Sequence, residues 1–381
     1  MKITTIIGAR PQFIKAAAIS RAIAGYNEGL SPFFLKENGD SVPHYTQSPV
    51  IEEILIHTGQ HYDDDMSAIF FRELEIPEPK YNLNIGSGSH GLQTGRMLMA
   101  IEDVLLQEKP DWVLIYGDTN STLAAALAAA KLHIRIAHVE AGLRSYNRLM
   151  PEEINRIVAD QLSYLLLCPS QVAVNNLAME GITKGVSITG DVMADALQFA
   201  ATKVSANSDI LARLGLQPQG YLLATVHRAE NTDNPDRLGH IMAAFSELAE
   251  REAVVLPLHP RTKKILDDNF SLRLTLHPSL KIIDPVGYFD MIALENAARM
   301  ILTDSGGIQK EAYWLKVPCI TLRDETEWIE TVERGWNILT GANRDRIIKA
   351  VTTFNVPSEH PPLYGDGRAA EKILDVLCQK A

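Results

Sequence analysis

Apolar, β-branched segments alternate with helix-like segments along almost the whole chain, and this alternation restricts the fold more than any other feature. Short runs such as residues 3–8, 112–117 and 221–227 are apolar on both faces, as in strands buried between helix layers. The stretches between such runs, for example residues 122–132 and 236–252, have the apolar spacing of helices. The pattern predicts an α/β fold with parallel sheets.

The length of the chain predicts two domains, because 381 residues exceed what one ordinary core accommodates. Residues 195–215 are polar and have no strand pattern, so we place the boundary there. We expect an N-terminal α/β domain over residues 1–195 and a C-terminal α/β domain over residues 196–360. A final helix within residues 361–381 has apolar positions at helical spacing and is expected to pack back on the N-terminal domain.

Composition excludes several classes of protein. The formal net charge of −11 argues against a general nucleic-acid binder, whose affinity comes from Lys and Arg on phosphates. Cys168 and Cys319 lie in apolar runs and are expected to be buried thiols. The N-terminal apolar run stops at Arg10, which favours a first core strand over a signal peptide. No apolar run is long enough to span a bilayer, so we expect a cytoplasmic protein without a membrane partner.

Almost every predicted strand is followed by a polar or charged residue. In the first half these residues are Arg10, Gln60, His61, Asp118, Glu140 and Asp191. In the second half they are His227, Arg228, His259, Arg261, Asp304, Ser305 and Arg323. Ligands of open parallel sheets bind outside the carboxyl ends of the strands. We therefore predict two doubly wound, Rossmann-like domains that face each other across a cleft, with a small-molecule site in that cleft.

The segment LTDSGGIQKEAYW is the clearest candidate for phosphate binding. Ser305 can cap the helix that follows, and Gly306 and Gly307 allow backbone amides to approach an anion at the helix N-terminus. Glu311, about one turn further into the helix, is placed to accept hydrogen bonds from a ribose. An ordinary serine cap with a tight turn is the alternative, and the charged strand ends around this segment favour phosphate binding.

Two further turns carry cations that suit a diphosphate. Arg10 and Lys15 in GARPQFIK follow the first strand; arginine makes directional contacts to diphosphate oxygens, and lysine acts as a compact charge or proton donor. His227 and Arg228 in ATVHRAEN follow a strand of the second half, where an imidazole can hold a phosphate or a hydroxyl. Taken singly, Arg10 and Lys15 are each more typical of a surface cation, and their place after a strand favours a function.

Carboxylates after strands of the first half are candidate proton carriers. Asp118 and Glu140 each end an apolar strand and precede a helix, and burial near like charge raises a carboxyl pKa into the useful range. Capping of the following helix is the alternative for Asp118. Glu152 and Arg156 lie four residues apart on one helix face, where a surface ion pair is the alternative. The 11 histidines show no metal-binding spacing, so we expect no metal site.

In their order and spacing, these motifs resemble the non-hydrolysing UDP-N-acetylglucosamine 2-epimerase family over nearly the whole chain. The matching segments are GARPQFIK, TGQH, GDTNST, HVEAGLRS, MPEEINR, ATVHRAEN, DSGGIQKEA and the Arg323 strand end. The resemblance implies a GT-B-like fold, a homodimer and a UDP-sugar substrate bound between the domains.

The resemblance also assigns roles to residues of this sequence. It implies a catalytic set made of Lys15, Asp118, Glu140, Glu152 and His227. It implies UDP contacts from Arg10, Arg228, Ser305, Gly306, Gly307 and Glu311, with Arg156 and Arg323 orienting the site. Gln60 and His61 match a loop that is regulatory in some members of the family.

Two segments depart from the family pattern and leave the substrate open. GQHYDDDM is two residues longer than the compact loop of the regulated members, and RDETEWIE stands where the best-studied UDP-N-acetylglucosamine enzymes have a TERPE pattern. Together with IDPVGYFDMI, these segments look more like the branch that acts on UDP-2,3-diacetamido-2,3-dideoxyglucuronate. Conversion of UDP-N-acetylglucosamine to UDP-N-acetylmannosamine for surface polysaccharides and the diacetamido uronate reaction are therefore both candidates.

The expected chemistry is elimination, because C2 of such a sugar is not adjacent to a carbonyl. Neither half has a GxGxxG turn after a strand, so transient oxidation by a nicotinamide is disfavoured and no cofactor is expected. Expulsion of UDP from C1, removal of the C2 proton and re-addition after protonation on the other face fit the residues. A GT-B glycosyltransferase, a hydrolysing epimerase and a non-enzymatic nucleotide-sugar sensor are the alternatives.

Overall fold

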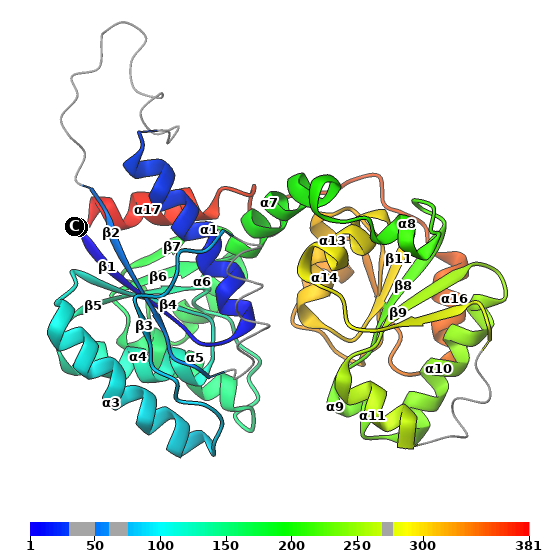
Figure 1. Cartoon of the computed structure of the whole chain (residues 1–381), viewed down its shortest axis with the longest axis horizontal. Coiled ribbons are helices and arrows are strands. Elements are labelled where there is room, and N and C mark those ends of the chain that lie inside the picture. Colours follow the sequence, from blue (N-terminus) through cyan, green and yellow to red (C-terminus); the bar gives the residue numbers. More distant parts are fainter. Residues whose placement is uncertain (30–49, 61–74, 269–276, 381) are drawn as a thin grey trace, which may run out of the picture. The chain divides into compact units, whose positions relative to one another are not determined.

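The computed structural model describes residues 1–29, 50–60, 75–268 and 277–380, and the chain divides into two compact units (Figure 1). The first unit comprises Met1–Gln198 and Tyr364–Ala381, and the second comprises Phe199–Leu363. Helix α7 (Val192–Asn207) leads from the first unit into the second.

The first unit is built on one seven-stranded parallel sheet of order β3-β2-β1-β4-β5-β6-β7. Its strands are β1 Lys2–Ile7, β2 Glu52–His57, β3 Tyr81–Asn82, β4 Trp112–Tyr116, β5 Arg135–Val139, β6 Leu165–Cys168 and β7 Val186–Ile188. Its helices besides α7 are α1 Arg10–Asn27, α3 His90–Glu108, α4 Asn120–Lys131, α5 Pro151–Leu162, α6 Gln171–Met179 and α17 Ala369–Gln379. The order reverses direction between β1 and β4, which makes this the topological switch point of the sheet.

The second unit repeats the design with a six-stranded parallel sheet of order β10-β9-β8-β11-β12-β13. Its strands are β8 Tyr221–Thr225, β9 Ala253–Pro257, β10 Leu280–Ile283, β11 Met300–Thr303, β12 Cys319–Thr321 and β13 Asn337–Leu339. Its helices are α8 Ile210–Leu214, α9 Ala229–Thr232, α10 Pro235–Ala249, α11 Pro260–Asp268, α13 Tyr288–Ala297, α14 Gly306–Trp314, α15 Ile329–Glu333 and α16 Arg344–Thr353. The switch point lies between β8 and β11. The predicted α/β fold class with two doubly wound sheets is confirmed.

The central strands are buried because both faces of each sheet carry helices. All five residues of β4 and all five of β8 are buried. Helix α4 is rich in alanine, and these small side chains let it pack closely against α3 and α5. Cys168 and Cys319 are buried as expected, and burial raises the pKa of each thiol to about 12, so both thiols stay protonated at neutral pH.

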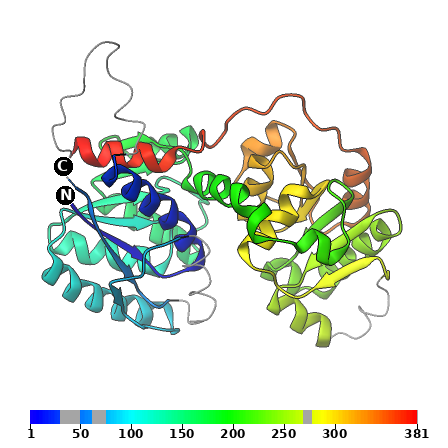
Figure 2. The ribbon, with the colours of Figure 1, turned by 45° about the horizontal axis from the view of Figure 1, so that its top comes forward.

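The last helix, α17, belongs to the first unit and lies beside α1 (Figure 2). The Asp195 carboxylate on α7 accepts hydrogen bonds from the backbone N–H groups of Ala369 at 3.1 Å and Ala370 at 2.9 Å. At the other end of the helix, the Arg135 guanidinium donates to the carbonyl of Lys380 at 2.6 Å. These contacts fix both ends of α17 on residues that precede it by more than 150 positions.

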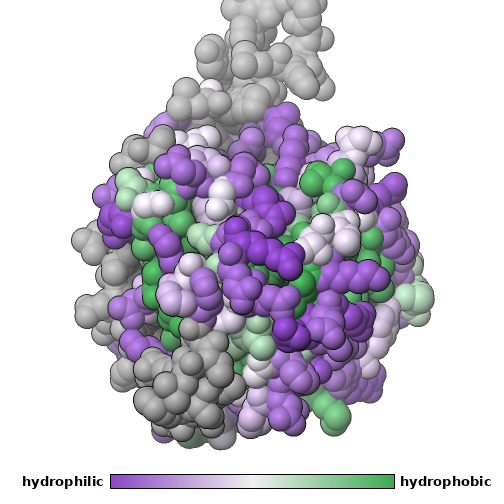
Figure 3. All heavy atoms as spheres, turned by 90° about the vertical axis from the view of Figure 1, so that its right-hand side faces the viewer, coloured by the Kyte–Doolittle hydropathy of each residue, from purple (hydrophilic) through white to green (hydrophobic). Residues whose placement is uncertain are grey.

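The described part of the chain contains no helix that is both long and apolar enough to cross a bilayer. Within the same residues, His, Cys, Asp and Glu side chains form no group of three or more suited to a metal ion. Hydrophilic side chains cover most of the face drawn in Figure 3, and the hydrophobic ones lie there in small separate groups.

Two glycines of the first unit give a matched test of the packing around β6. Gly185 and Gly181 both have left-handed backbones, with φ of 71° and 80°. A Cβ on Gly185 would lie 2.1 Å from the carbonyl oxygen of Tyr164, whereas one on Gly181 would meet nothing within 4 Å. We predict that Gly181→Ala lowers the free energy of unfolding by about 1–2 kcal/mol, the cost of a left-handed alanine. Gly185→Ala should cost clearly more, because the backbone beside Tyr164 must move.

Urea denaturation followed by circular dichroism measures both variants. Equal losses of stability would contradict the close approach between Gly185 and Tyr164.

Candidate active site

Lys15 and Glu140 form an ion pair at the carboxyl edge of the first sheet. Lys15 lies on α1 and Glu140 follows β5; the ammonium group donates to the Glu140 carboxylate, and only 10% and 11% of the two side chains are exposed. Gly117 at the end of β4 makes room for the pair, because a Cβ there would lie 3.2 Å from the carboxylate and 3.3 Å from the ammonium. Glu140 has a left-handed backbone, with φ of 69°, a strained conformation of the kind found at functional sites.

Asp118 follows β4 beside this pair and contacts Arg156 of helix α5. The Arg156 guanidinium forms an ion pair with Asp118 and a second one with Glu153 at 2.9 Å. The Asn155 side-chain amide donates to the Asp118 backbone carbonyl at 2.8 Å. Helix α5 therefore holds Asp118 through both its side chain and its backbone.

The structure decides two alternatives that the sequence leaves open. The cap of α4 is Thr119, whose hydroxyl accepts a hydrogen bond from the Thr122 N–H at 3.3 Å, so Asp118 does not cap that helix. Among the described residues, Arg156 pairs with Asp118 and Glu153 and not with Glu152, whose side chain is exposed in the first turn of α5.

The electrostatic setting suits Asp118 to carrying a proton. Burial raises the pKa of Asp118 above its ordinary value, and the neighbouring carboxylates of Glu140 and Glu152 raise it further. The cations of Arg156 and Lys15 oppose this rise without cancelling it. A carboxyl group whose pKa moves toward neutrality exchanges protons more readily at physiological pH.

In the second unit, the N-terminus of α14 forms the centre of the candidate phosphate site. The Ser305 hydroxyl caps the helix by accepting a hydrogen bond from the Ile308 N–H at 3.4 Å. Gly306 and Gly307 occupy the first turn, and a Cβ on Gly307 would come no closer to other atoms than 3.9 Å. The N–H groups of a first helical turn have no intrahelical acceptor, so this end of α14 attracts anions.

Arginines of two neighbouring loops surround this turn. A Cβ on Gly306 would lie 3.6 Å from an Arg228 nitrogen and 3.7 Å from a Glu327 carboxylate oxygen. Arg323 donates two hydrogen bonds to Glu327, at 2.9 and 3.1 Å. Burial disfavours the charge of Glu327, but its hydrogen bonds from Arg323 outweigh this and its pKa is lowered. The carboxylate is therefore ionised, and it holds Arg323 beside Gly306.

Asp304 organises the loop after β8 and has a structural role. Its carboxylate is fully buried and accepts hydrogen bonds from the backbone N–H groups of His227 and Arg228, both at 3.0 Å. The Asn231 side-chain amide donates to it at 3.1 Å. Burial lowers the pKa of His227, and the nearby His259 and Arg228 add to this while Asp304 opposes it. The His227 ring is therefore neutral at pH 7.

Two buried glutamines, which the sequence does not single out, form hydrogen bonds that connect turns at the strand ends. Gln12 accepts hydrogen bonds from the Gly8 N–H at 2.8 Å and the Ala9 N–H at 3.1 Å, and it donates to the Tyr116 carbonyl at 2.9 Å. Gln309 accepts from Thr326 at 2.6 Å. No sequence signal marks these partners, because the turns they join are distant along the chain.

The remaining predicted residues divide into described and undescribed ones. Gln60 accepts hydrogen bonds from the Ser121 hydroxyl at 2.7 Å and from its N–H at 3.2 Å, so it supports the start of α4. Glu311 is buried on α14. Arg10 begins α1, but its side chain lies outside the described part of the structure, as does His61.

The predicted residues thus form two groups, one in each unit. Lys15, Asp118, Glu140 and Arg156 meet at the carboxyl edge of the first sheet. Arg228, Ser305, Gly306 and Arg323 gather around the N-terminus of α14, with His227 in the loop after β8. Two doubly wound sheets, each with polar and charged side chains at its carboxyl edge, define an α/β protein of the GT-B-like class.

Comparison with known proteins identifies the family. The chain matches the model of the UDP-N-acetylglucosamine 2-epimerase family over residues 44–378. It is 52% identical over 99% of both chains to a UDP-N-acetylglucosamine 2-epimerase homolog of Methanococcus maripaludis. It is 49% identical over the full length of both chains to the UDP-2,3-diacetamido-2,3-dideoxy-D-glucuronate 2-epimerase of Pseudomonas aeruginosa.

A solved structure agrees with these sequence relatives. The UDP-GlcNAc 2-epimerase of Methanocaldococcus jannaschii in complex with UDP-GlcNAc and UDP matches all of both chains with a TM-score of 0.84 and 45% identity. The chain belongs to the UDP-N-acetylglucosamine 2-epimerase family, which confirms the resemblance of its motifs.

The electrostatic interaction between the Asp118 and Glu140 carboxylates gives a test of the residue group in the first unit. We predict that Glu140→Gln lowers the pKa of Asp118, because it removes a negative charge that favours the protonated form. Carbon-13 NMR titration of the Asp118 carboxyl measures this shift. Asp103→Asn, on an exposed position of α3, is the matched control and should leave the titration unchanged. An unchanged or higher pKa in Glu140→Gln would show that the two carboxylates do not interact.

Proposed function

We propose that the protein epimerises C2 of UDP-N-acetylglucosamine, giving UDP-N-acetylmannosamine, without net hydrolysis. The observation that carries this proposal is the group of Lys15, Glu140 and Asp118, three ionisable side chains held together at one sheet edge. Family membership and the 46% identical UDP-N-acetylglucosamine 2-epimerase of Methanocaldococcus jannaschii support it. We further propose a cytoplasmic homodimer that supplies precursors of surface polysaccharides.

In this proposal the second unit binds the nucleotide. The first-turn amides of α14, with Arg228 and Arg323, stabilise the charge that develops on the diphosphate as it leaves C1. Glu311 accepts hydrogen bonds from the ribose, and Arg10 adds a further cation. Because the first-turn amides belong to a capped helix and Arg323 is paired with Glu327, little reorganisation accompanies departure of UDP.

The first unit moves the protons. A base removes the C2 proton as UDP leaves, which gives a glycal, and an acid delivers a proton to the opposite face before UDP adds back. Asp118, Glu140 and Glu152 are the proton carriers, and Lys15 forms an ion pair with Glu140. His227, neutral at pH 7, contacts a phosphate or hydroxyl as donor or acceptor.

A second substrate, UDP-2,3-diacetamido-2,3-dideoxyglucuronate, also has specific support. The segments GQHYDDDM and RDETEWIE depart from the pattern of the best-studied UDP-N-acetylglucosamine enzymes. The Pseudomonas aeruginosa relative named for this sugar is 49% identical over the full chain. The same elimination and re-addition serve both sugars, because C3 and C6 do not react.

Nucleotide binding and turnover should be separable by mutation. We predict that Ser305→Ala weakens UDP binding about tenfold, the loss expected for one hydrogen bond to a charged group. Asp118→Asn and Glu140→Gln should lower turnover by about 100-fold or more, as removal of a general acid or base does, and leave UDP affinity within about twofold.

Isothermal calorimetry with UDP measures the binding, and Asn343→Ala is the matched control for Ser305→Ala. Asn343 caps α16 in the same unit, so its replacement removes a helix cap without touching the proposed site. Loss of UDP binding in the carboxylate variants, or equal losses in Ser305→Ala and Asn343→Ala, would overturn the assigned roles.

Exchange of the C2 hydrogen with solvent tests the proposed reaction and distinguishes the two candidate sugars. We predict that turnover in deuterated water places deuterium at C2 of the sugar that the enzyme accepts, because the proton passes through ionisable side chains. Proton NMR after separate incubations with UDP-N-acetylglucosamine and the diacetamido uronate identifies that sugar. Release of free sugar would indicate a hydrolysing epimerase, and absence of exchange with both sugars would contradict the proposal.

A further inference from the structure

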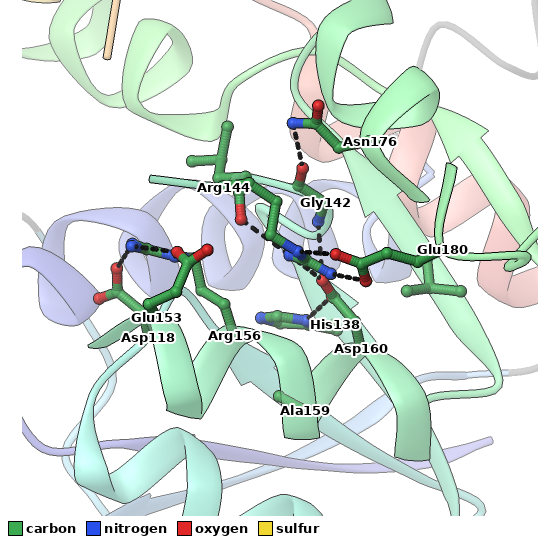
Figure 4. A network of polar contacts seen from close by, with 12 residues as sticks. Asp118, His138, Gly142, Arg144, Glu153, Arg156, Ala159, Asp160, Asn176 and Glu180 are labelled. Atoms are coloured by element: carbon green, nitrogen blue, oxygen red, sulfur yellow. Dashed lines mark hydrogen bonds and ion pairs between the residues drawn. The ribbon is translucent and has the colours of Figure 1, made fainter. Parts of the chain in front are cut away.

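His138, two residues before Glu140 on β5, lies at the centre of a buried polar network (Figure 4). Its side chain is fully buried. The ring nitrogen Nδ1 lies 2.7 Å from an Asp160 carboxylate oxygen, and Nε2 lies 2.8 Å from the carbonyl oxygen of Gly117. Gly117 immediately precedes Asp118, so the ring contacts the peptide that leads into the proposed proton carrier.

Asp160 extends the network to the turn after Glu140. Its second oxygen accepts hydrogen bonds from the Gly142 N–H at 3.2 Å and from Arg144 at 2.7 Å. Arg144 also donates to both oxygens of Glu180, each at 2.7 Å. The side chain of Asp160 is fully buried and that of Arg144 is 1% exposed.

The partners of His138 fix where its hydrogens lie. A backbone carbonyl only accepts hydrogen bonds, so Nε2 carries a hydrogen that it donates to Gly117. Asp160 accepts from Arg144 and Gly142 as a carboxylate does, so Nδ1 carries a hydrogen as well. Burial works against the charge of Asp160, but His138 and Arg144 outweigh it and lower its pKa.

We propose that His138, held by Asp160 as a doubly protonated ring, is a positioning residue for the epimerisation. It fixes the Gly117–Asp118 peptide, while Asp160 fixes the turn that follows Glu140. This inference rests on the proposed function. It adds a residue that touches neither the sugar nor UDP.

Stability of the fold alone does not account for such a network. Burying several charges costs desolvation energy, and well-packed apolar residues in their place often leave a protein equally or more stable. The network instead connects the two backbone turns that carry Asp118 and Glu140. Each turn contains a left-handed glycine, Gly117 with φ of 60° and Gly142 with φ of 81°. Because glycine has more backbone freedom than other residues, side-chain contacts are needed to hold these turns in one conformation.

The charges around the two groups determine the expected pH effect. His138 faces Asp160 of α5 and the Gly117 carbonyl, with Arg144 on the far side of Asp160 and the Cys168 thiol of β6 near the same carboxylate. The charged groups that face Asp118 are Arg156 and Glu152 of α5, Glu140 after β5 and Lys15 of α1. Asp160→Asn removes the negative charge of Asp160 together with the positive charge of the ring, so the net charge of this setting stays the same and the pH dependence of turnover should not move.

Nitrogen-15 NMR of histidine-labelled full-length protein tests the protonation directly. We expect one ring with hydrogens on both nitrogens, because both hydrogen-bond partners of the His138 ring are acceptors. This signal should be lost in Asp160→Asn, because the amide donates a hydrogen bond to Nδ1 and leaves the ring neutral. A wild-type His138 ring with a hydrogen on only one nitrogen would overturn the proposal.

Kinetics of Asp160→Asn distinguish positioning from structural support. The amide oxygen still accepts from Gly142 and Arg144, so the fold and UDP affinity should persist within about twofold. We expect kcat for C2 exchange to fall about tenfold or more, because small displacements of reacting groups are costly. His133→Asn, at an exposed position whose left-handed backbone asparagine tolerates, is the control and should retain activity.

A wild-type kcat in Asp160→Asn would overturn the positioning role. Failure of the proposed function is separately visible, because wild-type protein would then exchange C2 of neither UDP-sugar. In that event the nitrogen-15 spectrum would still confirm or refute the doubly protonated ring.

Discussion

Parallel pairing at the two switch points, β1 with β4 and β8 with β11, is the constraint on which the rest of the structure depends. In a parallel sheet the carboxyl ends of neighbouring strands lie at the same edge, so short turns after each strand bring their side chains together. Lys15 and Asp118 reach one edge from turns that lie about a hundred residues apart in the sequence. Arg228 and Ser305 reach the other edge in the same manner. Without this register, no helix cap or ion pair could assemble either group.

The two edges show different electrostatic designs. The first combines carboxylates with cations, so that burial and like charge raise the pKa of Asp118 while ion pairs keep Glu140 and Arg156 in place. The second combines helix amides with arginines and needs no titrating group near neutral pH. One unit is thus suited to moving protons and the other to binding an anion, on the same type of sheet.

Much of this arrangement follows from local sequence pattern. Apolar runs indicate the strands, and the polar residue after each run marks a side chain at the sheet edge, which is how Asp118, Glu140 and Ser305 become candidates. The local pattern does not predict the partners of these residues. Arg156 contacts Asp118 from helix α5, and the second partner of Arg156 is Glu153 rather than Glu152. His138 lies inside a strand with no local mark of its role. Long-range hydrogen bonds select these partners, and a single sequence carries no periodic signal of them.

The placement of α17 has a consequence for how the protein is made. The chain leaves the first unit at α7, builds the whole second unit, and only then returns with the helix that docks on α1 and on Asp195. During synthesis the ribosome therefore releases the second unit as one contiguous block, and the first unit receives α17 only after that block has been made. The first unit therefore begins to emerge before the second and becomes complete after it.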